Sequence, residues 1–154
     1  MNIREAQLAD CGKLRSLILK AAEPHRYEDF TEEGWINFCK PNELNSIRNR
    51  LQNKEYLTLC YIENEEILGV ITFYKFEKLD QLFIHPSARR RGIATSLWMA
   101  ARNICEAEGR KPNYWLKSSP MAVPLYENFG FHLTGDQEIR FGITCYPMEF
   151  SYEG

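Results

Sequence analysis

The segment Arg89-Arg90-Arg91-Gly92-Ile93-Ala94 stands between an apolar run at residues 82–84 and a helical pattern over residues 95–108. A chain-breaking His85-Pro86 pair separates the strand-like run from this basic loop. The first turn of a helix leaves backbone N–H groups without partners, and the helix dipole makes that end positive. Gly92 allows a positive φ and a close approach of a ligand, while the arginines offer fork-shaped donors to phosphate oxygens. The layout therefore predicts an α/β unit that binds a phosphate-containing ligand.

Three successive arginines also have a second interpretation, as a solvated surface or a nucleic-acid patch. A further motif bears on the choice. Ala122-Val123-Pro124-Leu125-Tyr126 is typical of a short helix, which Gly130 ends before a new strand starts at Phe131. The two segments together resemble the GNAT superfamily of N-acetyltransferases. Arg89-x-x-Gly92-x-Ala94 matches its cofactor loop, Gln/Arg-x-x-Gly-x-Gly/Ala, and Ala122-x-x-x-Tyr126 with Gly130-Phe131 matches its second signature. The resemblance covers most of the chain and is strongest over residues 67–131.

Composition fits one domain over residues 1–154, with 44% hydrophobic and 13% aromatic residues. The net charge of −2 provides no general attraction to nucleic acid, so we expect no nucleic-acid partner. Neither a signal peptide nor an apolar run of about 20 residues is visible, so we expect no membrane span. The histidines are scattered, and no metal site is expected. Five cysteines without Cys-x-x-Cys spacing indicate reduced thiols in a cytoplasmic protein.

Hydrophobic periodicity and turn residues predict the order of elements. Asp10 is expected to cap the first helix, and Thr31 is expected to cap the helix that carries Trp35 and Phe38. Pro41 is expected to stand in the first turn of the helix after that one. Residues 24–30 are predicted to be a loop. The expected strands cover residues 1–7, 56–62, 66–76, 79–84, 113–117, 131–141 and 143–150, and the expected helices residues 11–22, 42–52, 95–108 and a short segment around Tyr126. This order is that of a GNAT-like fold, an α/β (α+β) domain whose central mixed, twisted sheet has helices on both faces.

The resemblance implies acetyl-CoA as acetyl donor. In the family, the strand before the cofactor loop splays from the next strand, and the pantetheine arm lies between them. Ser119 stands where the family often has Asn, and Arg90 where many members have a small Gly. The implied cofactor-binding residues are Phe83, Ile84, Arg89, Arg90, Arg91, Gly92, Ile93, Ala94, Thr95, Ser119 and Tyr126.

Tyr126 is the candidate general acid that protonates the departing thiolate. Its alternative is a buried ring with a hydroxyl bonded elsewhere. For the general base, Asp80 is the first choice, followed by Glu77 and His85, and each also suits a turn or strand-end position. The catalytic pair expected from the sequence is therefore Tyr126 and Asp80.

The acceptor region is expected to include Tyr27, Trp35 and Phe38, although Trp35 and Phe38 also suit the core face of a helix. The resemblance implies direct transfer of an acetyl group to a primary amine of a small molecule or peptide. A non-catalytic acyl-CoA-binding regulatory module and nucleic-acid binding through residues 89–91 are the alternatives. Pairing of the C-terminal strands between two copies would make a homodimer.

Overall fold

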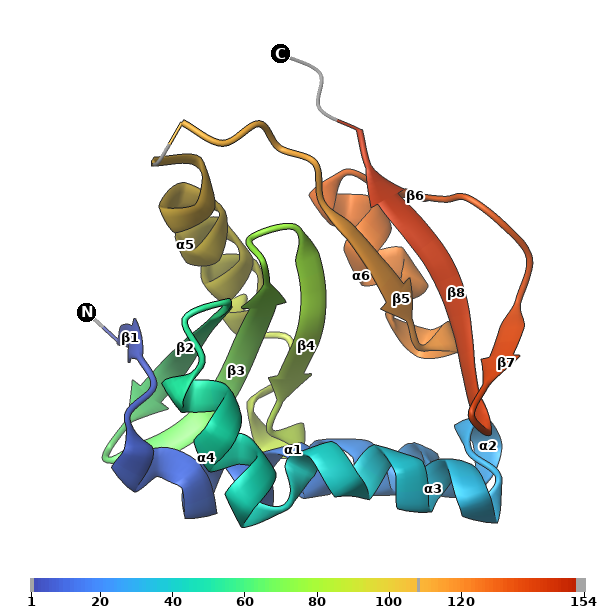
Figure 1. Cartoon of the computed structure of the whole chain (residues 1–154), viewed down its shortest axis with the longest axis horizontal. Helices are drawn as coiled ribbons and strands as arrows, with labels where there is room; N and C mark the ends of the chain where they lie inside the picture. Colours follow the sequence, from blue (N-terminus) through green and yellow to red (C-terminus); the bar gives the residue numbers. More distant parts are fainter. Residues whose placement is uncertain (1, 108, 152–154) are drawn as a thin grey trace.

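A computed structural model describes residues 2–107 and 109–151 of the chain (Figure 1). The ends of the first predicted strand at Met1 and of the predicted helix at Glu108 lie outside the described residues. The helices are α1 (Cys11–Ala22), α2 (Arg26–Asp29), α3 (Glu32–Cys39), α4 (Leu44–Gln52), α5 (Ile93–Ala107) and α6 (Val123–Phe129). The strands are β1 (Ile3–Glu5), β2 (Tyr56–Glu63), β3 (Glu66–Tyr74), β4 (Lys78–Ile84), β5 (Trp115–Ser118), β6 (Phe131–Leu133), β7 (Glu138–Arg140) and β8 (Ile143–Phe150).

The strands form one mixed sheet in the order β1-β2-β3-β4-β5-β8-β6, with β7 paired to β8. We call β1 to β4 the first arm of the sheet and β5 to β8 the second arm. The arms meet where β4 and β5 run parallel, and of the described residues only Lys78 and Trp115 are paired there. Trp115 N–H also donates to the Glu77 carbonyl at 3.1 Å. From this point the two strands diverge, so the sheet is open between Ile84 and Ser118 (Figure 1).

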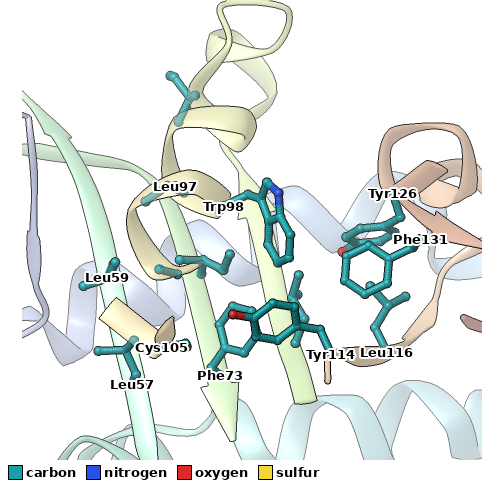
Figure 2. Close-up of a cluster of buried hydrophobic side chains, with 14 of the residues drawn as sticks. Leu57, Leu59, Phe73, Leu97, Trp98, Cys105, Tyr114, Leu116, Tyr126 and Phe131 are labelled. Carbon is teal, nitrogen blue, oxygen red and sulfur yellow. The ribbon is translucent and has the colours of Figure 1, made fainter. Parts of the chain in front are cut away.

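Helices cover both faces of the first arm, as the sequence predicts. On one face α1 and α4 pack on the sheet around a cluster that includes Leu14, Ile18, Ile47, Cys60 and Val70. On the other face α5 packs through Leu97, Trp98 and Ala101 against a larger cluster (Figure 2). That cluster continues into the second arm, where it contains Tyr114, Leu116, Tyr126, Phe131 and Met148. The core on the α5 side therefore joins the two arms over a larger area than the sheet does, because β4 and β5 are paired at one pair of described residues only.

Several local predictions were wrong. Residues 24–30 are not a loop but contain α2. The predicted strand over residues 131–141 is divided into β6 and β7. Asp10 does not cap α1, because its carboxylate accepts bonds from Arg4 at 2.8 and 3.0 Å and from the Gln7 N–H at 2.7 Å. Pro41 lies in a separate 3-10 turn (Lys40–Asn42) before α4.

Thr31 does cap its helix, since its hydroxyl oxygen accepts the Gly34 N–H at 2.9 Å. The five cysteines, all of them within the described residues, form no disulfide, and all except Cys39 are buried. Among the described residues, no helix combines the length and the apolarity that crossing a membrane requires. In the same part of the chain, His, Cys, Asp and Glu side chains do not gather in a group that could hold a metal ion.

Burial of Cys60 in the α1-side core predicts loss of stability in alkali. Burial raises the pKa of Cys60 to about 12, whereas the pKa of a thiol in the unfolded chain is about 8.5. The native state therefore retains a proton that the unfolded state loses, so stability is constant below about pH 8.5 and falls up to about pH 12. At pH 10.5 the expected loss from this group is about 2.7 kcal/mol.

Urea unfolding of wild type and Cys60→Ala between pH 7 and pH 10.5 measures this effect. We expect Cys60→Ala to be less stable at pH 7, because a small cavity remains. Above pH 8.5 the free energy of unfolding of wild type is expected to fall more steeply than that of Cys60→Ala, and the two slopes are expected to differ by about 1.4 kcal/mol per pH unit. Parallel curves would show that Cys60 does not carry the effect.

Candidate functional site

The segment between β4 and α5 has the backbone shape of an anion-binding loop. Arg90 and Gly92 adopt left-handed conformations, with φ of 63° and 78°. A Cβ added at Gly92 would meet no protein atom within 4 Å, so the space beside this backbone is open. Ser96 N–H donates to the Gly92 carbonyl at 3.0 Å and starts the helical bonding pattern. The N–H groups of Ile93, Ala94 and Thr95 therefore precede that pattern and can point to an anion.

The three arginines of this loop differ in their surroundings. Arg91 makes an ion pair with Glu63 at the end of β2, with 2.6 Å between Nη2 and Oε2. That hydrogen bond raises the pKa of Arg91. Arg89 and Arg90 are exposed, and within the described parts of the chain neither forms a salt bridge. These two guanidinium groups are the ones available to phosphate oxygens.

The open edge of β4 presents main-chain groups toward the second arm. His85 N–H donates to Leu68 on β3 at 2.8 Å, and Phe83 is paired with Val70 on that strand. Main-chain groups alternate in direction along a strand, so those of Leu82 and Ile84 face away from β3. Ile84 thus offers unpaired main-chain groups between the arms, while Phe83 offers its ring on the α1 face.

On the second arm, Ser119 and Tyr126 follow the open end of β5. Ser119 is exposed and precedes a 3-10 turn (Pro120–Ala122) that leads into α6. Tyr126 is 7% exposed, and its ring packs against Phe129 and Phe131. Its hydroxyl points toward the middle of the cluster in Figure 2, and among the described side chains none is hydrogen-bonded to it. Burial raises the pKa of Tyr126, which keeps the phenol protonated.

The three candidate bases lie in different surroundings. Asp80 stands near the closed end of the gap between the arms, where its carboxylate is 3.2 Å from Lys78 Nζ. Glu77 is exposed in the turn just before β4. His85 accepts the Ser87 N–H through Nδ1 at 3.1 Å and so caps the 3-10 turn Pro86–Ala88. The structure thus gives Asp80 and His85 local partners.

The residues expected at the acceptor side fall into two groups. Trp35 and Phe38 stack at 5.5 Å between ring centroids, and Phe38 contacts Phe83 of β4 at 6.0 Å. Both therefore belong to an aromatic group that reaches the open end of β4, and Trp35 is buried as a core residue would be. Tyr27 is 86% exposed and lies outside these ring contacts. Arg26 links the groups, since its guanidinium lies 5.3 Å from the Tyr27 ring and 5.0 Å from the Trp35 ring.

Asp29 is a residue of this region that the sequence analysis did not single out. It is 9% exposed at the end of α2, and burial raises the pKa of its carboxyl. A carboxylate with a raised pKa is a stronger base than an exposed one. The signal in the sequence was the mixture of aromatic and ionisable residues over positions 24–30, but burial within such a segment depends on the helices around it.

The chain is similar in sequence and in fold to known proteins. The family model described as acetyltransferase (GNAT) domain matches residues 22–152. A GCN5-related N-acetyltransferase from Rhodopseudomonas palustris superposes with a TM-score of 0.82 and 18% identity, covering 97% of this chain and 94% of the other. The PaiA N-acetyltransferase from Thermoplasma acidophilum, in complex with coenzyme A, has a TM-score of 0.81 and 18% identity, and the match covers 97% of this chain and 98% of the other. An aminoglycoside 6'-N-acetyltransferase complexed with coenzyme A has a TM-score of 0.69 and 14% identity, and the match covers 97% of this chain and 96% of the other. No curated protein sequence matches.

Proposed function

The chain belongs to the GNAT family of acetyltransferases, and from that membership we propose that it transfers an acetyl group from acetyl-CoA to a primary amine. The observation that carries the proposal is the loop at residues 89–95, where a left-handed Gly92 leaves open space beside unpaired helix N–H groups. The diphosphate of coenzyme A fits this loop in charge and in hydrogen-bond demand. The coenzyme A complexes of two structural neighbours are consistent with this choice of ligand.

Acetyl-CoA would supply the acetyl group as a thioester. Arg89, Arg90 and the N–H groups of residues 92–95 would hold its phosphates. The main-chain groups of Ile84 face the gap between the arms and would hydrogen-bond the pantetheine arm or the acetyl oxygen. Tyr126 would donate a proton to the departing thiolate. A thiol has a reference pKa of about 8.5, below that of tyrosine, and burial raises the pKa of Tyr126 further, so this donation relies on the geometry in which the hydroxyl would meet the sulfur.

The acceptor would enter beside α2 and α3, where the charge pattern suits an amine. The residues from Glu23 to Glu33 include Glu28, Asp29 and Glu32, opposed by His25 and Arg26. Alkyl amines are protonated at neutral pH, so this acidic segment attracts the acceptor before it loses its proton. Asp29 and Asp80 are the candidate groups that take that proton. Cysteines that form no disulfide among the described residues suit a reducing compartment, and we propose the cytoplasm as the location.

Arg89 provides a test of the phosphate assignment. We expect Arg89→Ala to weaken coenzyme A binding about tenfold at low salt and to leave pantetheine binding unchanged, because pantetheine lacks the nucleotide phosphates. The loss should become smaller as salt rises, since exposed charges are screened. Arg91→Ala is the comparison variant, because Glu63 already occupies its guanidinium. Isothermal titration at two salt concentrations measures both, and an equal loss for coenzyme A and pantetheine would contradict the assignment.

Turnover of acetyl-CoA with a panel of primary amines, followed by detection of the free thiol, tests the proposed activity. We expect thiol release that depends on one class of amine. Binding of acetyl-CoA without turnover across small-molecule, peptide and polyamine acceptors would instead favour the non-catalytic acyl-CoA-binding module. Salt-sensitive binding of nucleic acid in place of coenzyme A would show that residues 89–91 serve a different ligand.

A further inference from the structure

The helix α3 lies at the open end of the gap and contacts both arms of the sheet (Figure 1). Its N-terminal side meets the two-residue turn between β7 and β8, Phe141-Gly142. The Thr31 N–H donates to the Gly142 carbonyl at 2.9 Å, and Asn37 Nδ2 donates to the Phe141 carbonyl at 2.9 Å. Gly34 packs so closely on Gly142 that a side chain at position 34 would collide with the Gly142 carbonyl group.

The turn that α3 contacts is itself held in one shape. Phe141 and Gly142 have φ of 52° and 78°, which is the pattern of a tight two-residue hairpin turn. Phe30, immediately before α3, forms an isolated bridge with Ile143 at the start of β8. These contacts fasten one end of α3 to the second arm.

The other end of α3 is fastened to the first arm through a buried amide. Asn42 is 1% exposed and donates to the Phe38 carbonyl of α3 at 2.9 Å. Gln81 of β4 donates to Asn42 Oδ1 at 2.9 Å, and Arg50 supports the same turn by donating to the Pro41 carbonyl at 2.8 Å. The ring contact between Phe38 and Phe83 adds an apolar attachment to the same strand.

This double attachment matters because the sheet does not set the distance between its arms at their open ends. Of the described residues, Lys78 and Trp115 alone pair β4 with β5, at the closed end. A short helix with its hydrogen bonds formed is stiff along its axis and resists both widening and narrowing of the gap. Contacts of α3 with both arms therefore fix a spacing that strand pairing leaves open.

We propose that α3 is a strut that sets the spacing between the two arms, and that Asn37 and Gln81 are the positioning residues in its attachments to the second arm and to the first arm. The proposal rests on the proposed function, because the ligand whose fit depends on this spacing is the pantetheine arm of coenzyme A. The phosphate loop belongs to the first arm alone, through β4 and α5. Loss of a strut contact is therefore expected to affect the pantetheine arm and to spare the phosphates.

Two ligands separate these effects: coenzyme A, and adenosine 3′,5′-bisphosphate, which has nucleotide phosphates but no pantetheine. We expect Asn37→Asp, which keeps the shape but removes the donor, and Gln81→Leu each to weaken coenzyme A binding about tenfold. Binding of the bisphosphate is expected to stay within about twofold of wild type. Asn49→Ala, at an exposed amide of α4, is the matched control and is expected to change neither affinity.

Isothermal titration of the folded variants, checked by thermal melts, distinguishes the outcomes. Equal losses for the two ligands, or none for coenzyme A, would overturn the strut while leaving the proposed function intact. Wild-type protein that binds the bisphosphate and coenzyme A with the same affinity would overturn the strut as well, because the pantetheine arm would then contribute nothing. Wild-type protein that binds neither ligand would overturn the cofactor assignment and the strut with it.

Discussion

Tyr126→Phe is expected to lower kcat by about 10²–10⁴-fold, the usual contribution of a general acid. The KM for acetyl-CoA should change little, because the ring retains its contacts with Phe129 and Phe131 and only the hydroxyl is lost. Burial raises the pKa of Tyr126, so loss of its proton should not limit the rate below about pH 10. Steady-state kinetics between pH 6 and pH 10, with an acceptor from the amine panel, measures both effects.

Tyr114 offers a matched control for this substitution. It is a buried tyrosine of the same core cluster, but its hydroxyl donates to Glu106 at 2.8 Å. We expect Tyr114→Phe to lower stability by about 1 kcal/mol and to leave kcat unchanged. A wild-type kcat in Tyr126→Phe would remove Tyr126 from the catalytic residues. A rise in KM with an unchanged kcat would instead mean that the hydroxyl contributes to binding in the ground state.

Gly92→Val is expected to weaken acetyl-CoA binding by about 30-fold or more, equivalent to about 2 kcal/mol of backbone strain and lost contacts. The φ of 78° is unfavourable for a β-branched residue, so the loop should leave this shape and turn its N–H groups away from the phosphates. A side chain at position 92 would also fill the open space beside the backbone. Titration calorimetry of the folded variant measures the affinity.

Gly109, after the end of α5, separates the loss of binding from the loss of stability. Its φ of 77° and the empty space around its Cβ position match those of Gly92. Gly109→Val should therefore lower stability by a similar amount, about 1–2 kcal/mol, without changing affinity for acetyl-CoA. Equal affinities for wild type and Gly92→Val would contradict the phosphate-binding role of the loop.

Features that depend on residues close together in the chain were predictable. The backbone shape of the loop between β4 and α5 needs a strand end, a glycine and a helix start within about a dozen residues, and local propensities determine all three. Arg90 shows how far such reasoning extends. The replacement of a small residue there predicts a constrained backbone, and the structure has Arg90 at a φ of 63°. A similar local pattern predicted the Thr31 cap, whereas the order of elements together with the family resemblance predicted the mixed sheet with helices on both faces.

Contacts between distant segments were decided by the tertiary structure. Arg91 is paired with Glu63, Asp29 is buried, and α3 joins Phe83 to the turn at Gly142. None of these follows from spacing, since each depends on which surfaces meet when the helices pack on the sheet. The sequence by itself determined the chemistry of the loop, because backbone shape and charge there are local properties. The width of the gap between the arms was decided only in three dimensions, because strand pairing ends at one residue pair and the other contacts between the arms, in the α5-side core and around α3, join segments far apart in the chain.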